Sequence, residues 1–284
     1  MAIPLNILVI GPKISGKSSF IASMISCLKR NTSIQLQSTD ELSGAERLIY
    51  ANRMCDIFTK GNIASNVWED DGRCSTKYIT SHEFNFYVGV WMNLKIIEVP
   101  GKTLDKNVAE VEPLIRKSQV IFITIDTPVL MEGEYRKSRN NTQTITDLLI
   151  SSIANIPSNQ VHKQQIQFIP LKCEKYFQSN SIAEVNATIK DAYEELIDYI
   201  HTQEQIKAFI TPAQTLGDLV FSHFYDKKAY YSFLSNAKYN PKRCEQSFLY
   251  ALDFMLKQHE WITPEEANRV NSVVYEILRN INYL

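Results

Sequence analysis

An apolar run that leads directly into a glycine turn constrains this chain more than any other feature. The run Leu5-Asn6-Ile7-Leu8-Val9-Ile10 predicts a short buried strand, and apolar residues at helical spacing predict a helix over residues 17–29. Between them, "GPKISGKS" (residues 11–18) fits the pattern G-x-x-x-x-G-K-[ST]. A strand, a glycine turn and a helix in this order are typical of a phosphate-binding loop at the edge of an α/β sheet.

Each constant position of this loop has a chemical reason. Gly11 and Gly16 allow backbone N–H groups to point inward around a phosphate, at the positive N-terminal end of the following helix. Lys17 reaches the β- and γ-phosphates, and the Ser18 hydroxyl is a ligand for Mg²⁺. Three neighbouring candidates for phosphate contact are Lys13, Ser15 and Ser19. The alternative is a glycine turn that starts a helix without holding a ligand.

Composition excludes several classes of protein. The 284 residues are 44% apolar and 21% charged, which suits one large globular domain or two small ones. A net charge of -1 argues against a general nucleic-acid or membrane-surface binder. We expect no membrane span and no secretory signal, because no apolar run is long enough and no basic segment opens the chain. Five scattered cysteines without C-x-x-C spacing indicate reduced thiols, and so a cytoplasmic protein.

Strand and helix patterns alternate along the chain, which predicts an α/β fold. We expect an antiparallel hairpin of residues 78–91 and 93–101, turning near Gly89 to Asn93. Further strands are expected at 119–126, 166–172 and 207–211, the last of these closing the series. Helices are expected at 42–59, 104–117, 141–154, 182–202, 244–258 and 264–282. The predicted architecture is a mostly parallel central sheet with helices on both faces, followed by C-terminal helices.

This pattern divides the chain into two parts. Residues 1–222 form the expected phosphate-binding domain, and residues 223–284 form a C-terminal helical extension packed on the same domain.

A magnesium-binding acid is expected at the end of a neighbouring strand. Glu98-Val99-Pro100-Gly101 resembles the GTPase pattern D-x-x-G, with Glu in place of Asp; the Gly101 N–H would sense the γ-phosphate. Asp126, after the strand 119–125, is the rival metal ligand. Position 102 is Lys rather than the Gln that orients attacking water in many GTPases. This predicts that GTP hydrolysis is slow, or that it needs a catalytic group from elsewhere in the chain or from a partner.

A first switch loop is expected over residues 60–81. Its candidate Mg²⁺ ligands are Ser75, Thr76 and Thr80, and the residues do not distinguish among them. Candidate arginines for stabilising transition-state charge are Arg73, Arg136 and Arg139.

The segment after the strand 166–171 indicates which base is bound. GTPases read guanine there with [NT]-K-x-D; Lys172 and Glu174 keep the packing and carboxylate roles, whereas Leu171 lacks the polar group of the first position. "FITPAQTLG" (209–217) would cover the other side of the base. Guanine is favoured over adenine, although Leu171 and Glu174 leave the choice open.

At this point the sequence resembles the TRAFAC-class bacterial GTPases, specifically the double-GTPase group of GTPase-associated conflict systems. The matching pieces are "GPKISGKSSF", "ITIDTPVLMEG", "IPLKCEKYF", "ITPAQTLGDLVF" and "KYNPKRCEQSFLYALDFML", which run from residue 11 to about 256. The resemblance implies a Ras-like fold that binds GTP or GDP with Mg²⁺. It also implies protein partners of the same system and a role in antiviral defence.

The sequence therefore predicts a GTP-binding molecular switch with slow or partner-assisted GTP hydrolysis, in which Lys17 and Gly101 stabilise the reacting phosphates. Two other functions stay open: a pseudo-GTPase scaffold, which Glu98 and Lys102 favour, and an ATP-dependent enzyme with Asp126 on the metal.

Overall fold

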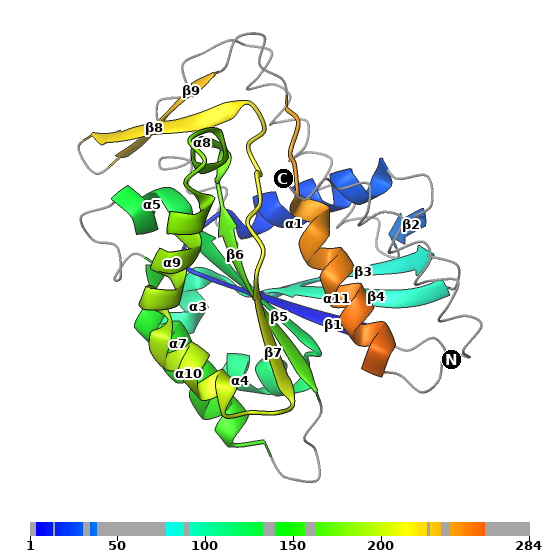
Figure 1. Ribbon diagram of the computed structural model, residues 1–284. Coiled ribbons are helices and arrows are strands. Elements are labelled where there is room, and N and C mark those ends of the chain that lie inside the picture. The colour runs from blue at the N-terminus through cyan, green and yellow to red at the C-terminus, as the bar shows by residue number, and fades with distance from the viewer. Residues whose placement is uncertain are drawn as a thin grey trace.

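The computed structural model describes residues 4–13, 15–30, 35–38, 78–87, 91–132, 140–156, 163–225, 228–233 and 239–258. The expected helices at 42–59 and 264–282 and most of the expected switch loop lie outside these residues. Figure 1 shows a twisted sheet with helices on both of its faces and a separate small ribbon at one end.

A seven-stranded sheet forms the centre of the molecule, in the order β2-β3-β4-β1-β5-β6-β7. Its strands are β1 (Pro4–Ile10), β2 (Gln35–Ser38), β3 (Thr80–Tyr87), β4 (Trp91–Glu98), β5 (Val120–Asp126), β6 (Gln164–Leu171) and β7 (Ile206–Ile210). The strands β4, β1, β5, β6 and β7 run parallel, while β2 and β3 pair antiparallel at one edge. The expected α/β class, with a mostly parallel sheet between helices, is confirmed.

The β1 strand is buried on both faces because its side chains alternate between two apolar cores. Ile7 and Val9 pack in the core under α1 (Lys17–Lys29) and α11 (Cys244–Gln258). Leu8 and Ile10 pack in the opposite core. The helices that cover this opposite core are α3 (Gly101–Lys106), α4 (Val108–Lys117), α7 (Thr142–Ala154), α9 (Ile182–Ala192) and α10 (Glu194–His201). Two further short helices are α5 (Thr127–Glu132) and α8 (Glu174–Gln178). All parallel strands therefore end at one edge, where the connecting loops gather.

Two segments expected as single helices are each broken by one residue. The 104–117 segment divides at Asn107, whose φ of -134° and ψ of 54° end α3 and start α4. The 182–202 segment divides at Tyr193, whose buried ring packs 5.1 Å from the ring of Phe168. Burying this ring against β6 turns the chain, and helical periodicity alone gives no sign of such a turn.

The antiparallel edge hairpin was predicted, but its second strand begins earlier than expected. Tyr87 pairs with Trp91, and Asn85 pairs with Asn93, so β4 begins at Trp91 rather than at residue 93.

A second sheet corrects the expectation that 207–211 is the last strand. β8 (Leu219–Tyr225) and β9 (Lys228–Phe233) pair antiparallel, apart from the seven-stranded sheet. Figure 1 shows this two-stranded ribbon lying over α8. The expected boundary at residue 222 falls inside β8, and α11 lies in one core with α1 and β1. The division of the chain into two parts stays a prediction.

Candidate functional site

The glycine turn forms at the carboxyl end of β1 and leads directly into α1, as the sequence predicts. Gly11 and Gly16 have φ values of 153° and 102°. Residues with a side chain rarely adopt this backbone conformation. A Cβ on Gly11 would overlap the Thr124 side chain and lie 2.6 Å from the Thr124 carbonyl oxygen. Glycine at position 11 is therefore required both by the backbone conformation and by the close approach of β5.

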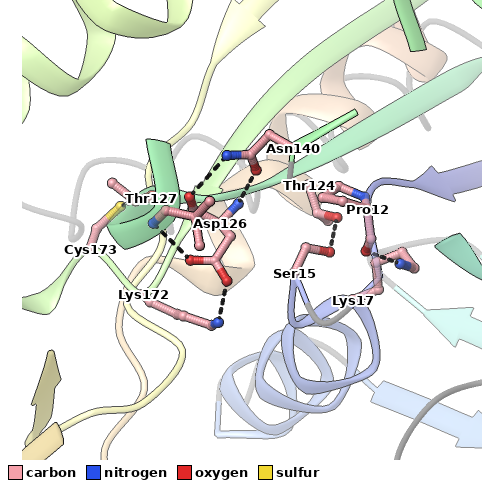
Figure 2. A network of polar contacts seen from close by, with 10 residues as sticks. Pro12, Ser15, Lys17, Thr124, Asp126, Thr127, Asn140, Lys172 and Cys173 are labelled. Carbon is pink, nitrogen blue, oxygen red and sulfur yellow. Dashed lines mark hydrogen bonds and ion pairs between the residues drawn. The ribbon is translucent and has the colours of Figure 1, made fainter. Parts of the chain in front are cut away.

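Ser15 fixes the loop to the sheet rather than pointing to solvent. Its buried hydroxyl lies 2.9 Å from the Thr124 hydroxyl (Figure 2). The Thr124 hydroxyl in turn donates to the Ile10 carbonyl at 3.1 Å. This arrangement gives Ser15 a structural role in shaping the phosphate-binding loop. Of the other two candidates, Lys13 is exposed and Ser19 is buried in the first turn of α1.

The ammonium group of Lys17 lies inside the loop. It donates to the carbonyl oxygens of Gly11, at 3.0 Å, and Pro12, at 2.8 Å. Burial lowers the pKa of Lys17 to about 8, although the nearby charge of Glu98 acts in the opposite direction. Phosphate oxygens form stronger, charge-assisted hydrogen bonds with an ammonium group than carbonyl oxygens do, so a bound phosphate would replace these two carbonyl partners.

Ser18 and Glu98 meet at the head of α1. The Ser18 hydroxyl donates to Glu98 Oε1 at 2.7 Å, and Glu98 is 3% exposed at the end of β4. Parallel pairing places Glu98 beside Val9, directly before the loop. A hydroxyl and a carboxylate are hard oxygen ligands of the kind that Mg²⁺ prefers, so these residues fit the expected ion.

Thr80 is the one candidate switch hydroxyl among the described residues. It pairs directly across from Glu98 on β3, and its Oγ1 is buried without a hydrogen-bond partner in the described part of the chain. Ser75 and Thr76 lie outside the described residues, as do Arg73, Arg136 and Arg139.

Gly101 begins α3 in direct contact with the glycine turn. A Cβ at this position would overlap the backbone nitrogen of Lys13 and lie 2.6 Å from the Pro12 carbonyl carbon. The amide of Gly101 is thus held beside the phosphate-binding loop, whereas the next residue, Lys102, is exposed.

Asp126 has a different role from that of a metal ligand. Its carboxylate accepts a hydrogen bond from the Lys172 ammonium at 2.6 Å, and Figure 2 shows the two side chains pointing toward each other. The Asn140 side chain holds the Asp126 backbone by accepting from its N–H at 3.0 Å. This arrangement favours Glu98 over Asp126 as the metal-binding acid, because the Asp126 carboxylate already neutralises a buried cation.

Lys172 is held in a strained turn between β6 and α8. Its φ of 60° lies in the left-handed region, which is costly for a residue with a side chain. Burial alone would lower the pKa of Lys172, but Asp126 and the hydroxyl of Tyr231 outweigh it and raise that pKa above its ordinary value. Its stem passes close to the glycine turn, since Lys172 Cε would lie 3.9 Å from a Cβ on Gly16.

Glu174 is buried with one oxygen bonded and the other free. Oε1 accepts from the Leu216 backbone N–H at 2.6 Å, which joins α8 to the 209–217 segment. Oε2 has no hydrogen-bond partner among the described residues, although Glu174 is only 1% exposed. Burial raises the pKa of Glu174 to about 8. A free, desolvated carboxylate oxygen of this kind is a strong acceptor for a donor on a ligand.

Tyr231 is a site residue that the sequence pattern did not identify. It lies on β9, is 3% exposed, and its hydroxyl hydrogen-bonds Lys172; burial raises the pKa of Tyr231 to about 12. Lys175 adds a second link, with its ammonium 5.2 Å from the ring centre of Phe221 on β8. The two-stranded sheet therefore covers the Lys172–Glu174 segment. A cluster of aromatic residues near 230 was the only sequence signal for this contact.

No protein-family model matches this chain, and no curated protein matches it. Among solved structures, the chain is similar to the Ski7 GTPase-like domain of S. cerevisiae bound to GDP and inorganic phosphate, with 14% identity and a TM-score of 0.48. That alignment covers 92% of this chain and 52% of the yeast chain, so this chain spans about half of the yeast chain's length. The GTP-bound form of the same domain gives 13% identity, a TM-score of 0.46 and the same coverages of 92% and 52%.

A third similar structure is the signal recognition particle receptor SRb-GTP/SRX complex from Chaetomium thermophilum. It gives 10% identity, a TM-score of 0.42, and coverage of 75% of this chain and 94% of the other. At this level of likeness the similarities carry no conclusion about a ligand or partner of this chain. Among the helices that the structure describes, none has both the length and the apolar character needed to cross a bilayer.

Proposed function

We propose that this protein is a guanine-nucleotide-binding switch that holds GTP or GDP with Mg²⁺ and hydrolyses GTP slowly or with a partner's help. The observation that carries the proposal is a convergence of three segments at the carboxyl ends of neighbouring parallel strands. Residues 11–18 follow β1, residues 98–101 end β4, and residues 172–174 follow β6. Ligands of open parallel sheets bind at this edge.

The phosphate end of the site is supported by charge and by backbone geometry. Lys17 and the N-terminus of α1 would hold the β- and γ-phosphates, and the Gly101 amide lies against the same loop. Ser18 and Glu98 would hold Mg²⁺, which neutralises charge on the phosphates when it is bound.

The base end is supported by the free oxygen of Glu174. Guanine presents two neighbouring donors, its N1–H and its amino group, whereas adenine presents one donor and one acceptor on the same edge. The buried Glu174 oxygen, which has no hydrogen-bond partner among the described residues, would accept from these donors once the carboxyl loses its proton, and it therefore favours guanine. Lys172, oriented by Asp126 and Tyr231, would pack its stem along the base.

Two parts of the proposal are supported by the sequence alone: the slow hydrolysis of GTP and the role in a bacterial defence system. Lys102 is an exposed cation where many GTPases have the Gln that orients water, so we propose that a partner supplies this group. The resemblance to double-GTPases supports a cytoplasmic regulatory role beside partner proteins of a bacterial defence system. In this role the γ-phosphate would hold the segment near residues 60–81 and the short helix α3 in place, and hydrolysis would release them.

Isothermal titration calorimetry with GTP, GDP and ATP, each with Mg²⁺, tests the proposal directly. We expect GTP and GDP to bind at least tenfold more tightly than ATP. Preference for ATP would instead indicate an ATP-dependent enzyme. Binding of none of the three by a folded protein would support the pseudo-GTPase scaffold, in which Lys17 keeps its bonds to the loop carbonyls.

Two variants separate the two ends of the site. Lys17→Ala is expected to reduce affinity for all three nucleotides by at least a hundredfold, because it removes the cation that faces the phosphates. Glu174→Ala is expected to weaken GTP at least tenfold while leaving ATP within about threefold, since it removes only the base-reading group. Equal losses for GTP and ATP in Glu174→Ala would show that Glu174 does not read the base.

A further inference from the structure

A buried histidine adjoins the proposed cation site and has no role in the proposed function. His82 lies on β3 two residues after Thr80, so the two side chains share the face of the sheet that also carries Glu98. The residue is 8% exposed. Its Nε2 atom lies 4.0 Å from the carboxylate of Glu98, one of the two proposed oxygen ligands of the cation.

The contacts of this imidazole do not explain why it is buried there. Nε2 lies 4.0 Å from Glu98 Oε2, which is too long for a hydrogen bond. Nδ1 is buried and has no hydrogen-bond partner in the described part of the chain. Burial of an imidazole without hydrogen bonds costs free energy, so a ligand that binds the ring would recover part of this cost.

The separation of the two groups suits two ligands of one metal ion. Metal–nitrogen and metal–oxygen bonds of about 2.1 Å place two ligands of the same ion at most about 4.2 Å apart. Glu98 has one oxygen toward Ser18, at 2.7 Å, and the other toward His82. The Glu98 carboxylate thus lies between a hydroxyl on one side and an imidazole on the other, next to the phosphate-binding loop.

We propose that His82 is a ligand of the cation through Nε2, and that the site therefore selects a first-row transition-metal ion such as Mn²⁺ over Mg²⁺. Mg²⁺ prefers oxygen ligands in an octahedron, whereas Mn²⁺ accepts an imidazole nitrogen more readily than Mg²⁺ does, and the later divalent ions accept it more readily still. The described residues hold no cluster of three or more His, Cys, Asp or Glu side chains, so the remaining positions would be filled by phosphate oxygens and water. The inference deepens the proposed nucleotide site, but its metal-binding part does not require a nucleotide.

Electron spin-echo modulation of bound Mn²⁺ tests the inference, because it detects nitrogen in the first coordination shell. The full-length protein is measured with Mn²⁺ alone and with Mn²⁺ and GDP. We expect ¹⁴N modulation in both samples, and we expect it to change to the ¹⁵N pattern when the protein is grown with ¹⁵N-histidine. The labelled wild-type protein keeps the test valid even where a variant fails to fold.

His82→Gln assigns the signal to one residue, and His223→Gln, on the exposed part of β8, is the matched control. We expect His82→Gln to lose the nitrogen modulation and to bind Mn²⁺ at least tenfold more weakly, with Mg²⁺ affinity changed less than threefold. His223→Gln is expected to keep both the modulation and the Mn²⁺ affinity.

The outcomes distinguish this inference from the proposed function. Nitrogen modulation with Mn²⁺ alone, in a protein that binds no nucleotide, would support His82 ligation while removing the guanine-nucleotide proposal. Tight GDP binding without nitrogen modulation, or modulation that persists in His82→Gln, would overturn the inference and leave the nucleotide proposal standing.

Discussion

At the scale of single residues, the buried amine of Lys17 predicts that nucleotide binding takes up protons, and this uptake can be measured. The pKa of Lys17 is lowered to about 8 by burial, so a fraction of the molecules carry a neutral amine near pH 8. Phosphate groups placed beside this amine would raise its pKa again, and nucleotide binding would then take up a proton. A terminal phosphate titrates near pH 6, so it does not contribute above pH 8.

We therefore predict uptake of about half a proton per bound nucleotide at pH 8, approaching about one at pH 9 and falling toward zero at pH 7. Affinity should fall correspondingly as the pH rises above about 8. Calorimetry in two buffers with different ionisation enthalpies measures this uptake. A proton count that does not change between pH 7 and pH 9 would contradict the role given to Lys17.

Features of the candidate site that depend on the properties of one residue could be predicted from the sequence. Gly11 and Gly16 have the positive φ values that a glycine turn needs, and the Ser18 hydroxyl donates to Glu98, whereas their roles in ligand binding stay predictions. The partners of Asp126 and Ser15 were not predictable, because Lys172 and Thr124 approach them only after β5 and β6 pair. A short sequence pattern therefore identifies the candidate residues of a site, but strand pairing determines which of these residues are in contact.

At the scale of elements, α3 packs closely against the glycine turn because its first residue, Gly101, has no side chain. Gly101 contacts the backbone of Lys13 and Pro12 too closely to accept a Cβ. Gly101→Ala must push α3 away from the glycine turn, and we expect a loss of about 1–3 kcal/mol in the free energy of unfolding. Nucleotide affinity should fall as well, because the amide of residue 101 moves away from the phosphates.

Urea denaturation and GDP titration measure these two effects. Lys106→Ala is a matched control, since Lys106 is an exposed residue of the same short helix. We expect this control to change stability by less than about 0.5 kcal/mol, as surface substitutions usually do. Equal stability of the two variants would show that the contact between α3 and the glycine turn is not under steric constraint.

The elements that the sequence pattern missed share a physical feature. β8 and β9 form a ribbon that is buried on α8 by a few large side chains, including Phe221 and Tyr231. Such a ribbon has neither the continuous apolar run of β5 nor a short turn motif between its strands. The polar strand β2 is likewise defined only by pairing with β3 at the sheet edge. Strands such as β5, buried along their whole length, were predictable.

At the scale of the whole molecule, the base end of the site couples stability to pH through Glu174. Its pKa is about 8 in the folded protein, against an ordinary value of 4.5. Between these values the folded state keeps a proton that the unfolded state releases, so the free energy of unfolding falls as the pH rises from about 5 to about 8. Above pH 8 this group contributes no further change.

Glu174→Gln removes this dependence, because an amide of nearly the same shape does not titrate. We expect the variant to match the wild type below about pH 5 and to become progressively more stable than the wild type up to pH 8. The gap should widen by up to about 1.4 kcal/mol per pH unit, so the whole interval is bounded by about 5 kcal/mol. Urea denaturation at intervals from pH 5 to pH 9 measures the two curves, with Glu184→Gln, an exposed carboxyl on α9, as the control. Parallel curves for Glu174→Gln and the wild type would mean that the carboxyl of Glu174 is ionised in the folded protein throughout this range. In that case GTP would meet a permanent negative charge, and its affinity would not vary with the protonation of Glu174.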